Sequence, residues 1–163
     1  MNKLYIITGP AGVGKSTISK SLAASLPKSV LIEGDTIYNF FVSDRISPWK
    51  PNAPLDLFWS NSIYLIKSYL EKGYNVIFNY IISPTNLKRI TEEIKHYEIN
   101  FSLLIASPEV LIKRDKLRSE DCQMKERVLV LLKQFLNYNY KEKDIIDTSN
   151  LSVEETVNKI INS

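Results

Sequence analysis

A phosphate-binding pattern lies near the start of the chain, where residues 9–16 read GPAGVGKS. Every fixed position of the pattern G-x-x-x-x-G-K-[ST] is filled. Glycines in such a loop let the backbone turn tightly, so that its N–H groups surround a phosphate at the positive end of the following helix. The lysine adds a positive charge for the β- and γ-phosphates, and the serine hydroxyl is suited to Mg²⁺. We therefore expect nucleotide contacts from Gly9, Ala11, Gly12, Val13, Gly14, Lys15, Ser16 and Thr17.

Two carboxylates follow the second apolar run, in the sequence Glu33-Gly34-Asp35. One carboxylate near a bound Mg²⁺ can hold a metal-bound water, and Glu33 is the candidate for that role. The other can take the proton of a substrate hydroxyl as it attacks a phosphate, which is the role expected of Asp35. The alternative is that Asp35 only caps a helix that starts at Thr36.

An aromatic region at residues 36–62 is the candidate pocket for a second substrate. Tyr38 and Trp49 are expected to contact that substrate, because aromatic walls with a few polar groups suit a small organic molecule. Trp49 stands in a proline-rich stretch that is typical of an irregular loop. Phe58 is expected to belong to the core instead.

A basic segment at residues 114–127 is the candidate for a small helical lid. Arg114 and Arg118 are four residues apart and so share one helix face, and Arg127 lies in the first turn of the next predicted helix. Phosphoryl transfer needs positive charge on the transferred group and exclusion of water, and a closing lid with arginines supplies both. The alternative is an ordinary solvated helix face.

The elements that must position these residues alternate between strands and helices. Parallel strands buried on both faces read as continuous apolar runs. Such runs predict strands at Leu4–Thr8, Val30–Glu33, Asn75–Tyr80, Phe101–Ala106 and Asp144–Asp147. Helical spacing and capping residues predict helices at 17–26, 55–71, from Ser83-Pro84, from Ser107-Pro108 to 116, at 126–140 and after Ser152. This order predicts a three-layer α/β/α sandwich with a five-stranded parallel sheet, in which ligands bind at the carboxyl ends of the strands.

Length and composition bound the remaining possibilities. The chain has 163 residues and a net charge of +3, so we expect a single domain over residues 1–163. The small and dispersed positive charge argues against a nucleic-acid partner. The one cysteine, Cys122, and the absence of a long apolar run lead us to expect a cytoplasmic protein without a membrane segment. A monomer or a homodimer is expected, and the sequence leaves the choice between them open.

Taken in order, these features resemble the small-molecule and nucleoside-monophosphate-like P-loop kinases. That group includes gluconate kinase, shikimate kinase, chloramphenicol phosphotransferase and many AAA-type ATP-binding kinases. The resemblance implies that Lys15 and Ser16 hold the phosphates and Mg²⁺, and that Arg118 reaches the transferred phosphoryl group. It further implies that Arg114 lies against the adenine or phosphates, and that Thr148 and Ser149 border the adenine.

One position departs from the pattern of the resembled family. The third strand ends in Asn79-Tyr80, where many relatives have an aspartate. A neutral Asn79 cannot replace a carboxylate at a metal, so we expect it to contact the acceptor.

These residues lead us to expect an ATP- and Mg²⁺-dependent phosphotransferase that moves the γ-phosphate to a hydroxyl of a small molecule. Lys15, Asp35 and Arg118 are the expected catalytic residues. ATP is expected over GTP, because no guanine-reading Asn-Lys-x-Asp element occurs. The alternatives are a polynucleotide or nucleotide kinase, and a nucleotide-binding switch or ATPase.

Overall fold

The computed structural model describes residues 2–120 and 123–163. Cys122 lies outside the described residues, as does a part of the predicted lid. In chain order the strands and helices are β1 (Lys3–Thr8), α1 (Lys15–Ser25), β2 (Ser29–Glu33), α2 (Gly34–Tyr38), α3 (Leu55–Glu71), β3 (Asn75–Asn79), α4 (Pro84–Glu93), β4 (Glu98–Ile105), α5 (Pro108–Lys116), α6 (Arg127–Asn137), the short 3₁₀ helix η2 (Glu142–Asp144), β5 (Ile145–Asp147) and α7 (Val153–Ile161).

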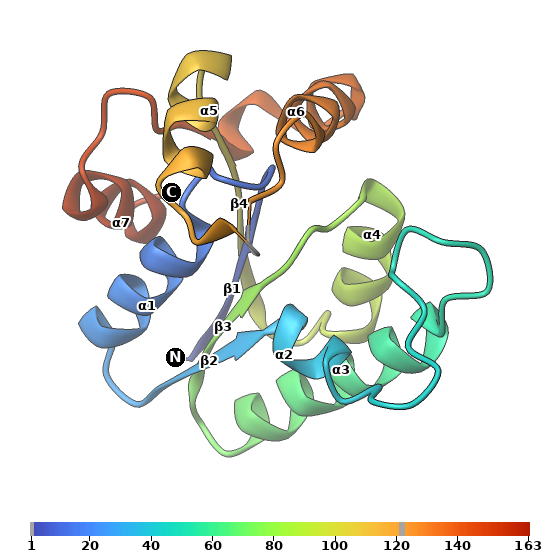
Figure 1. The fold of residues 1–163 in the computed structure, drawn as a ribbon. Helices are drawn as coiled ribbons and strands as arrows, with labels where there is room; N and C mark the ends of the chain where they lie inside the picture. Colours follow the sequence, from blue (N-terminus) through green and yellow to red (C-terminus); the bar gives the residue numbers. More distant parts are fainter. Residues whose placement is uncertain (1, 121–122) are drawn as a thin grey trace.

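The five strands form one parallel sheet in the order β2-β3-β1-β4-β5. Figure 1 shows α1 and α7 on one side of this sheet and α2, α3 and α4 on the other. The predicted α/β sandwich with a five-stranded parallel sheet is therefore confirmed. Because all strands run the same way, the loops that follow β1, β2 and β3 meet at one edge.

Alternating side chains of the strands pack into two separate hydrophobic cores. Leu4 and Ile6 of β1 pack in the core with α3 and α4, whereas Tyr5 and Ile7 pack in the core with α1, α5, α6 and α7. Side chains of a strand alternate between its faces, so a sheet covered on both sides buries nearly every residue. This explains why the strand sequences are continuously apolar.

Helix α3 spans Leu55–Glu71 as predicted. Strand β4 begins at Glu98, three residues before the predicted start, because it pairs with β1 from Lys3 onward, and α1 begins at Lys15, two residues before its predicted start. The helix predicted at 126–140 is shorter, because it begins at Arg127 and ends at Asn137. Beyond it, Tyr140 stacks on Phe101 and donates a hydrogen bond from its hydroxyl to the Ile82 carbonyl, at 2.6 Å. These contacts hold the chain after α6 against the loop that follows β3. None of the helices in the described ranges has the length and apolar content that crossing a membrane requires.

Candidate functional site

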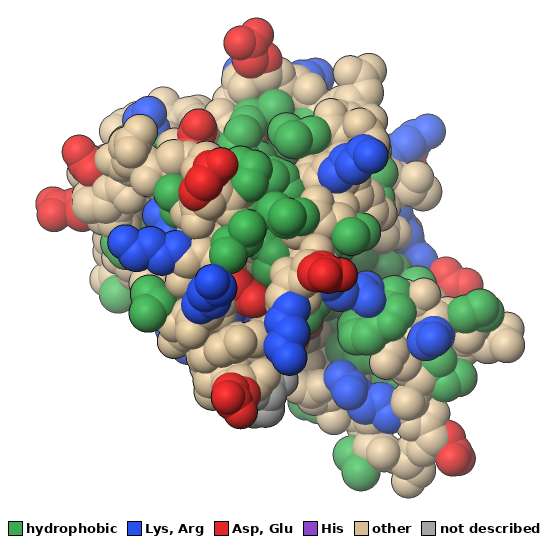
Figure 2. All heavy atoms as spheres, turned by 45° about the horizontal axis from the view of Figure 1, so that its top comes forward, with side chains coloured by type: hydrophobic (Ala, Val, Ile, Leu, Met, Phe, Trp, Pro, Cys, Tyr) green, Lys and Arg blue, Asp and Glu red, His purple; other side chains and the backbone are tan. Residues whose placement is uncertain are grey.

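A cavity of about 780 Å³ lies at the carboxyl ends of the strands. Figure 2 turns the top of Figure 1 toward the reader, and on this face two groups of hydrophobic side chains are separated by charged ones. Thirteen of the residues predicted to be functional line the cavity: Ala11, Gly12, Val13, Gly14, Lys15, Ser16, Thr17, Asp35, Trp49, Asn79, Arg114, Arg118 and Thr148. Gly9, Glu33, Tyr38 and Ser149 are not among the described residues that line it.

The loop between β1 and α1 has the backbone that a phosphate site needs. Gly9, Gly12 and Gly14 have φ values of 143°, 78° and 102°, which L side chains rarely adopt. A Cβ on Gly9 would also lie 2.2 Å from the Leu104 carbonyl oxygen, so the loop approaches β4 too closely for any other residue. Helix α1 starts after Gly14 without a side-chain cap. The first N–H groups of α1 therefore remain available to an anion.

Lys15 folds back over this loop. Its ammonium donates hydrogen bonds to the carbonyl oxygens of Gly9 and Pro10, at 2.9 and 3.0 Å. Burial lowers the pKa of Lys15 to about 8, the Asp35 carboxylate works in the opposite direction, and Arg118 lowers the pKa further. A phosphate chain would replace the two carbonyl groups as the partner of this ammonium and would stabilise its charge.

Ser16 at the start of α1 lies on the same face of the sheet as two polar residues at the ends of β2 and β3. The Asn79 amide donates a long hydrogen bond of 3.4 Å to the Ser16 hydroxyl. Glu33 and Asn79 are register partners in β2 and β3. Leu31 and Ile77, two residues before them, pack in the core that contains α1, so alternation places Glu33 and Asn79 on the α1 face as well. Among the described residues no cluster of three or more His, Cys, Asp or Glu side chains could hold a metal by itself.

Asp35 stands in the first turn of α2 and lines the cavity. The helix begins at Gly34, with Glu33 at the capping position and without a side-chain cap. The alternative that Asp35 caps a helix starting at Thr36 is therefore wrong, because Asp35 is already inside the helix. Its carboxylate lies close enough to Lys15 to raise the pKa of that lysine. Asp35 thus faces the phosphate loop across the cavity.

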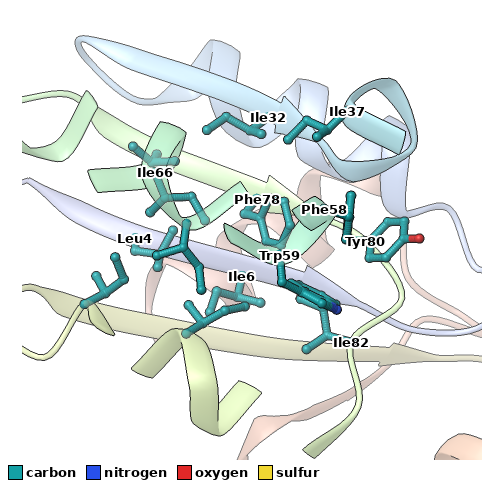
Figure 3. Close-up of a cluster of buried hydrophobic side chains, with 14 of the residues drawn as sticks. Leu4, Ile6, Ile32, Ile37, Phe58, Trp59, Ile66, Phe78, Tyr80 and Ile82 are labelled. Atoms are coloured by element: carbon teal, nitrogen blue, oxygen red, sulfur yellow. The ribbon is translucent and has the colours of Figure 1, made fainter. Parts of the chain in front are cut away.

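A cluster of aromatic rings forms the floor of the cavity beside Asp35. Trp59 and Tyr80 line the cavity although they are only 3% and 8% exposed. Both rings contact Phe58, with centroids 4.9 and 4.7 Å apart, and Phe58 itself is fully buried as predicted. Figure 3 shows Tyr80 at the end of this cluster, with its hydroxyl directed away from the other side chains. Burial, followed by the charge of Asp35, raises the pKa of Tyr80, so the hydroxyl keeps its proton and can donate a hydrogen bond.

Trp49 and Tyr38 differ from each other in position. Trp49 is 57% exposed at the mouth of the cavity, and the Arg127 guanidinium lies over its ring at 3.9 Å from the centroid. Tyr38 was expected to contact a substrate, and this expectation is wrong, because Tyr38 is buried and does not line the cavity. Its ring is buried against Phe58, and its hydroxyl donates to the Ile46 carbonyl at 2.7 Å. Tyr38 therefore anchors the loop after α2.

Arg114 joins the phosphate loop to the loop that follows β5. Its Nη1 donates to the Val13 carbonyl at 3.2 Å and to the Thr148 hydroxyl at 3.1 Å, and its Nη2 donates to the Thr148 carbonyl at 3.0 Å. Ser149 has a structural position, because its hydroxyl accepts a hydrogen bond from the Ser107 N–H at the start of α5. Thr148 lines the cavity and Ser149 does not, so only the former can border a bound base.

The segment after α5 is held by Asp115, a residue that the sequence analysis missed. This buried carboxylate accepts hydrogen bonds from the backbone N–H groups of Met124 and Lys125, at 2.9–3.1 Å, and from Arg118 at 3.4 Å. Within the helical lid predicted at 114–127, residues 114–116 end α5 and Arg127 begins α6, whereas the described residues between them, 117–120 and 123–126, contain no α-helix. A carboxylate within a run of charged residues gives no signal in the sequence that it is buried.

Comparison with known proteins places this site in a family. A family model described as an AAA domain matches residues 4–138. The tunicamycin resistance protein of Deinococcus radiodurans is similar in structure, with a TM-score of 0.71 and 22% identity over 99% of this chain and 95% of that one. A gluconokinase from Sinorhizobium meliloti 1021 has a TM-score of 0.69 and 19% identity over 98% and 90% of the two chains. A sugar kinase from Janibacter sp. HTCC2649 has a TM-score of 0.67 and 15% identity over 99% and 91%.

Proposed function

The chain belongs to the AAA domain family and has the fold of P-loop kinases, and we propose that it is an ATP- and Mg²⁺-dependent phosphotransferase. It transfers the γ-phosphoryl group to a hydroxyl group of a small-molecule acceptor. One observation carries this proposal: Lys15, Arg118 and Asp35 line a single cavity, with the two cations beside the phosphate loop and the carboxylate opposite them.

The donor half of the cavity is suited to a nucleoside triphosphate. The uncapped start of α1 and the glycine loop offer N–H groups to the β- and γ-phosphates, and Lys15 offers its ammonium. Arg114 is fixed between the phosphate loop and Thr148, at the end of the cavity where Thr148 and residues 151–153 would surround the base. The similar gluconokinase and sugar kinase have the same fold, which is consistent with this use of the loop.

The group of Ser16, Glu33 and Asn79 fits a magnesium ion that keeps most of its water. Mg²⁺ prefers oxygen ligands and is usually held by few protein groups together with the phosphates. The Ser16 hydroxyl would be a direct ligand, whereas the Glu33 carboxylate and the Asn79 carbonyl oxygen would bind metal-bound water. When bound, the ion would neutralise charge on the β- and γ-phosphates.

Asp35 acts on the acceptor. Its carboxylate takes the proton of the acceptor hydroxyl while that oxygen forms a bond to the γ-phosphorus, and the bond from phosphorus to the β–γ bridging oxygen breaks. Lys15 and Arg118 stabilise the negative charge on the transferred group and on the departing ADP. The products are ADP and a phosphate monoester, and the proton stays on Asp35 until solvent removes it.

The test is a screen of hydroxyl compounds in which ATP consumption is followed for the wild type and for Asp35→Asn. The variant should bind ATP as the wild type does and lose at least about a hundredfold in transfer rate, the size typical of a lost general base. Asp56→Asn is the matched control, since Asp56 is an exposed carboxylate that pairs with Arg89 outside the cavity. Equal single-turnover rates for Asp35→Asn and the wild type would remove Asp35 from the mechanism. ATP consumption that no hydroxyl compound stimulates would indicate an ATPase.

A further inference from the structure

The part of the cavity beside Asp35 is bounded by apolar and aromatic side chains from separate elements. They come from the loop before α3, from α3, from the end of β3 and from α6 (Figure 1). Six of them define the space: Trp49, Leu55, Trp59, Tyr80, Ile81 and Phe135. We call this part of the cavity the acceptor half.

Helix α6 forms the outer wall of the acceptor half. At its first residue, Arg127 stacks on Trp49 of the opposite loop at 3.9 Å. Beyond its end, the Tyr140 hydroxyl donates to the Ile82 carbonyl, next to the cavity residue Ile81. Contacts at both ends therefore fix α6 across the opening, and its Phe135 side faces the acceptor half.

The floor of the acceptor half is a fixed apolar surface. The rings of Trp59 and Tyr80 contact each other with centroids 5.7 Å apart, and Phe58 packs against both (Figure 3). The Gly34 backbone packs directly on Tyr80, since a Cβ there would lie 2.5 Å from its ring. An immobile apolar floor favours ligands with an apolar surface of their own, because their burial costs little reorganisation.

The charges around the cavity are unevenly distributed. Lys15, Arg114 and Arg118 contact or adjoin the phosphate loop, where a triphosphate would engage them. In the acceptor half, Asp35 is the only acidic residue among the described cavity residues, and the one cavity cation besides Lys15, Arg114 and Arg118 is Arg127, whose guanidinium stacks on the Trp49 ring. The other polar groups in its lining, which are the Tyr80 hydroxyl and the side chains of Ser83, Asn86 and Gln134, are neutral. An acidic acceptor would face the Asp35 carboxylate and lose its hydration, with the stacked Arg127 as the one cation left to it.

We propose that the acceptor is an uncharged hydroxyl compound with an apolar body of about the size of an aromatic ring, and that the acceptor half selects against acidic polyols and nucleic-acid ends. This inference rests on the proposed phosphotransferase activity. The apolar body lies on Trp59 and Tyr80, and the hydroxyl reaches Asp35. Ser83, Asn86 and Gln134 are available for neutral polar groups of the acceptor.

Three small probes and one oligonucleotide test the proposal by binding in the presence of ADP and Mg²⁺. 3-Phenyl-1,2-propanediol is neutral and aromatic, 3-phenyllactate has a carboxylate in place of one hydroxymethyl group, and glycerol lacks the aromatic body. Burying a phenyl group contributes roughly a tenfold to hundredfold gain in affinity, so the diol should bind that much more tightly than glycerol. It should also bind at least about tenfold more tightly than phenyllactate or an oligothymidylate with a free 5′-hydroxyl.

A pair of variants links this preference to the acceptor half. Ile81→Asp places a charge in the apolar wall, and it should weaken diol binding at least about tenfold while ADP binding is unchanged. Ile112→Asp is the matched control, because Ile112 is 37% exposed, Ile81 is 39% exposed, and only Ile81 lines the cavity. The control should leave both affinities unchanged.

Several results would overturn the proposal. The first is that phenyllactate, glycerol or the oligonucleotide binds as tightly as the diol or more tightly. The second is that the diol does not bind, and the third is that the Ile81→Asp variant binds the diol with the wild-type affinity. Phenyllactate binding that is lost in Arg127→Gln would identify a carboxylate subsite instead. Binding and phosphate transfer are measured separately. If the probes bind in the expected order but none is phosphorylated, the proposed activity is refuted and the acceptor class is not. If acidic probes are phosphorylated, the acceptor class is refuted and the activity is not.

Discussion

Proton uptake on ATP binding is a direct consequence of the position of Lys15. The Lys15 side chain is partly buried, and this desolvation lowers its pKa to about 8, so about half of the free protein carries a neutral Lys15 at pH 8. A bound triphosphate favours the ammonium and should return its pKa toward the ordinary value. Binding should therefore take up about half a proton per ATP at pH 8, about a tenth at pH 7 and about nine-tenths at pH 9. The affinity for ATP should fall about tenfold between pH 7 and pH 9 for the same reason.

Isothermal titration calorimetry measures this uptake from the dependence of the binding enthalpy on the ionisation enthalpy of the buffer. Titrations in HEPES and in Tris at each pH give the number of protons. The Asp35→Asn variant is the control, because the Asp35 carboxylate raises the pKa of Lys15 and its loss should therefore shift that pKa in a known direction. Its removal should lower that pKa and increase uptake at pH 7. Binding without buffer dependence at pH 8, together with a constant affinity from pH 7 to pH 9, would refute the argument that Lys15 is desolvated in the free protein.

Three further substitutions test the packing around the site. Gly34→Ala places a Cβ 2.5 Å from the Tyr80 ring, and it should cost about 1–3 kcal/mol of unfolding free energy in urea. Asp115→Asn should cost about 1–3 kcal/mol at pH 7. Burial alone would raise the pKa of Asp115, but hydrogen bonds hold it below 3.8, so this difference should vanish as acid protonates the wild-type carboxylate. Ser152→Ala removes the capping box with Glu155, and it should lower stability by about 1 kcal/mol in thermal unfolding, whereas Glu154→Ala should have a smaller effect.

Local signals in the sequence were sufficient for most of the fold. Helix α3 was predicted with its observed bounds because it lies between Pro54 and Gly73, and Gly73 has the positive φ of a helix end. Ser83 and Ser107 cap their helices in front of a proline, as their sequences indicated. The phosphate loop was recognisable because its chemistry is contained within eight consecutive residues.

Predictions that depended on the direction of a side chain were less successful. Tyr38 belongs to an aromatic stretch, but its hydroxyl reaches Ile46 and its ring lies in the core. Asp115 reads as one charge among many, although it binds the backbone nine and ten residues further along the chain. Such roles follow from which face of a helix meets the rest of the molecule, and the composition of a segment does not contain that information. The position of Tyr80 and Trp59 at the floor of the cavity could not be predicted, because it depends on how α3 packs on the sheet.

The central claim is that the γ-phosphoryl group of ATP is transferred to an organic hydroxyl with Asp35 as the base. Phosphorus NMR of a reaction with ATP, Mg²⁺ and an accepted alcohol measures this outcome directly. We expect the signal of a phosphate monoester to appear with that of ADP in equal amounts, and both to form at least about a hundredfold more slowly with Asp35→Asn. Inorganic phosphate as the sole product beside ADP, or monoester formation at the wild-type rate in the variant, would contradict the account.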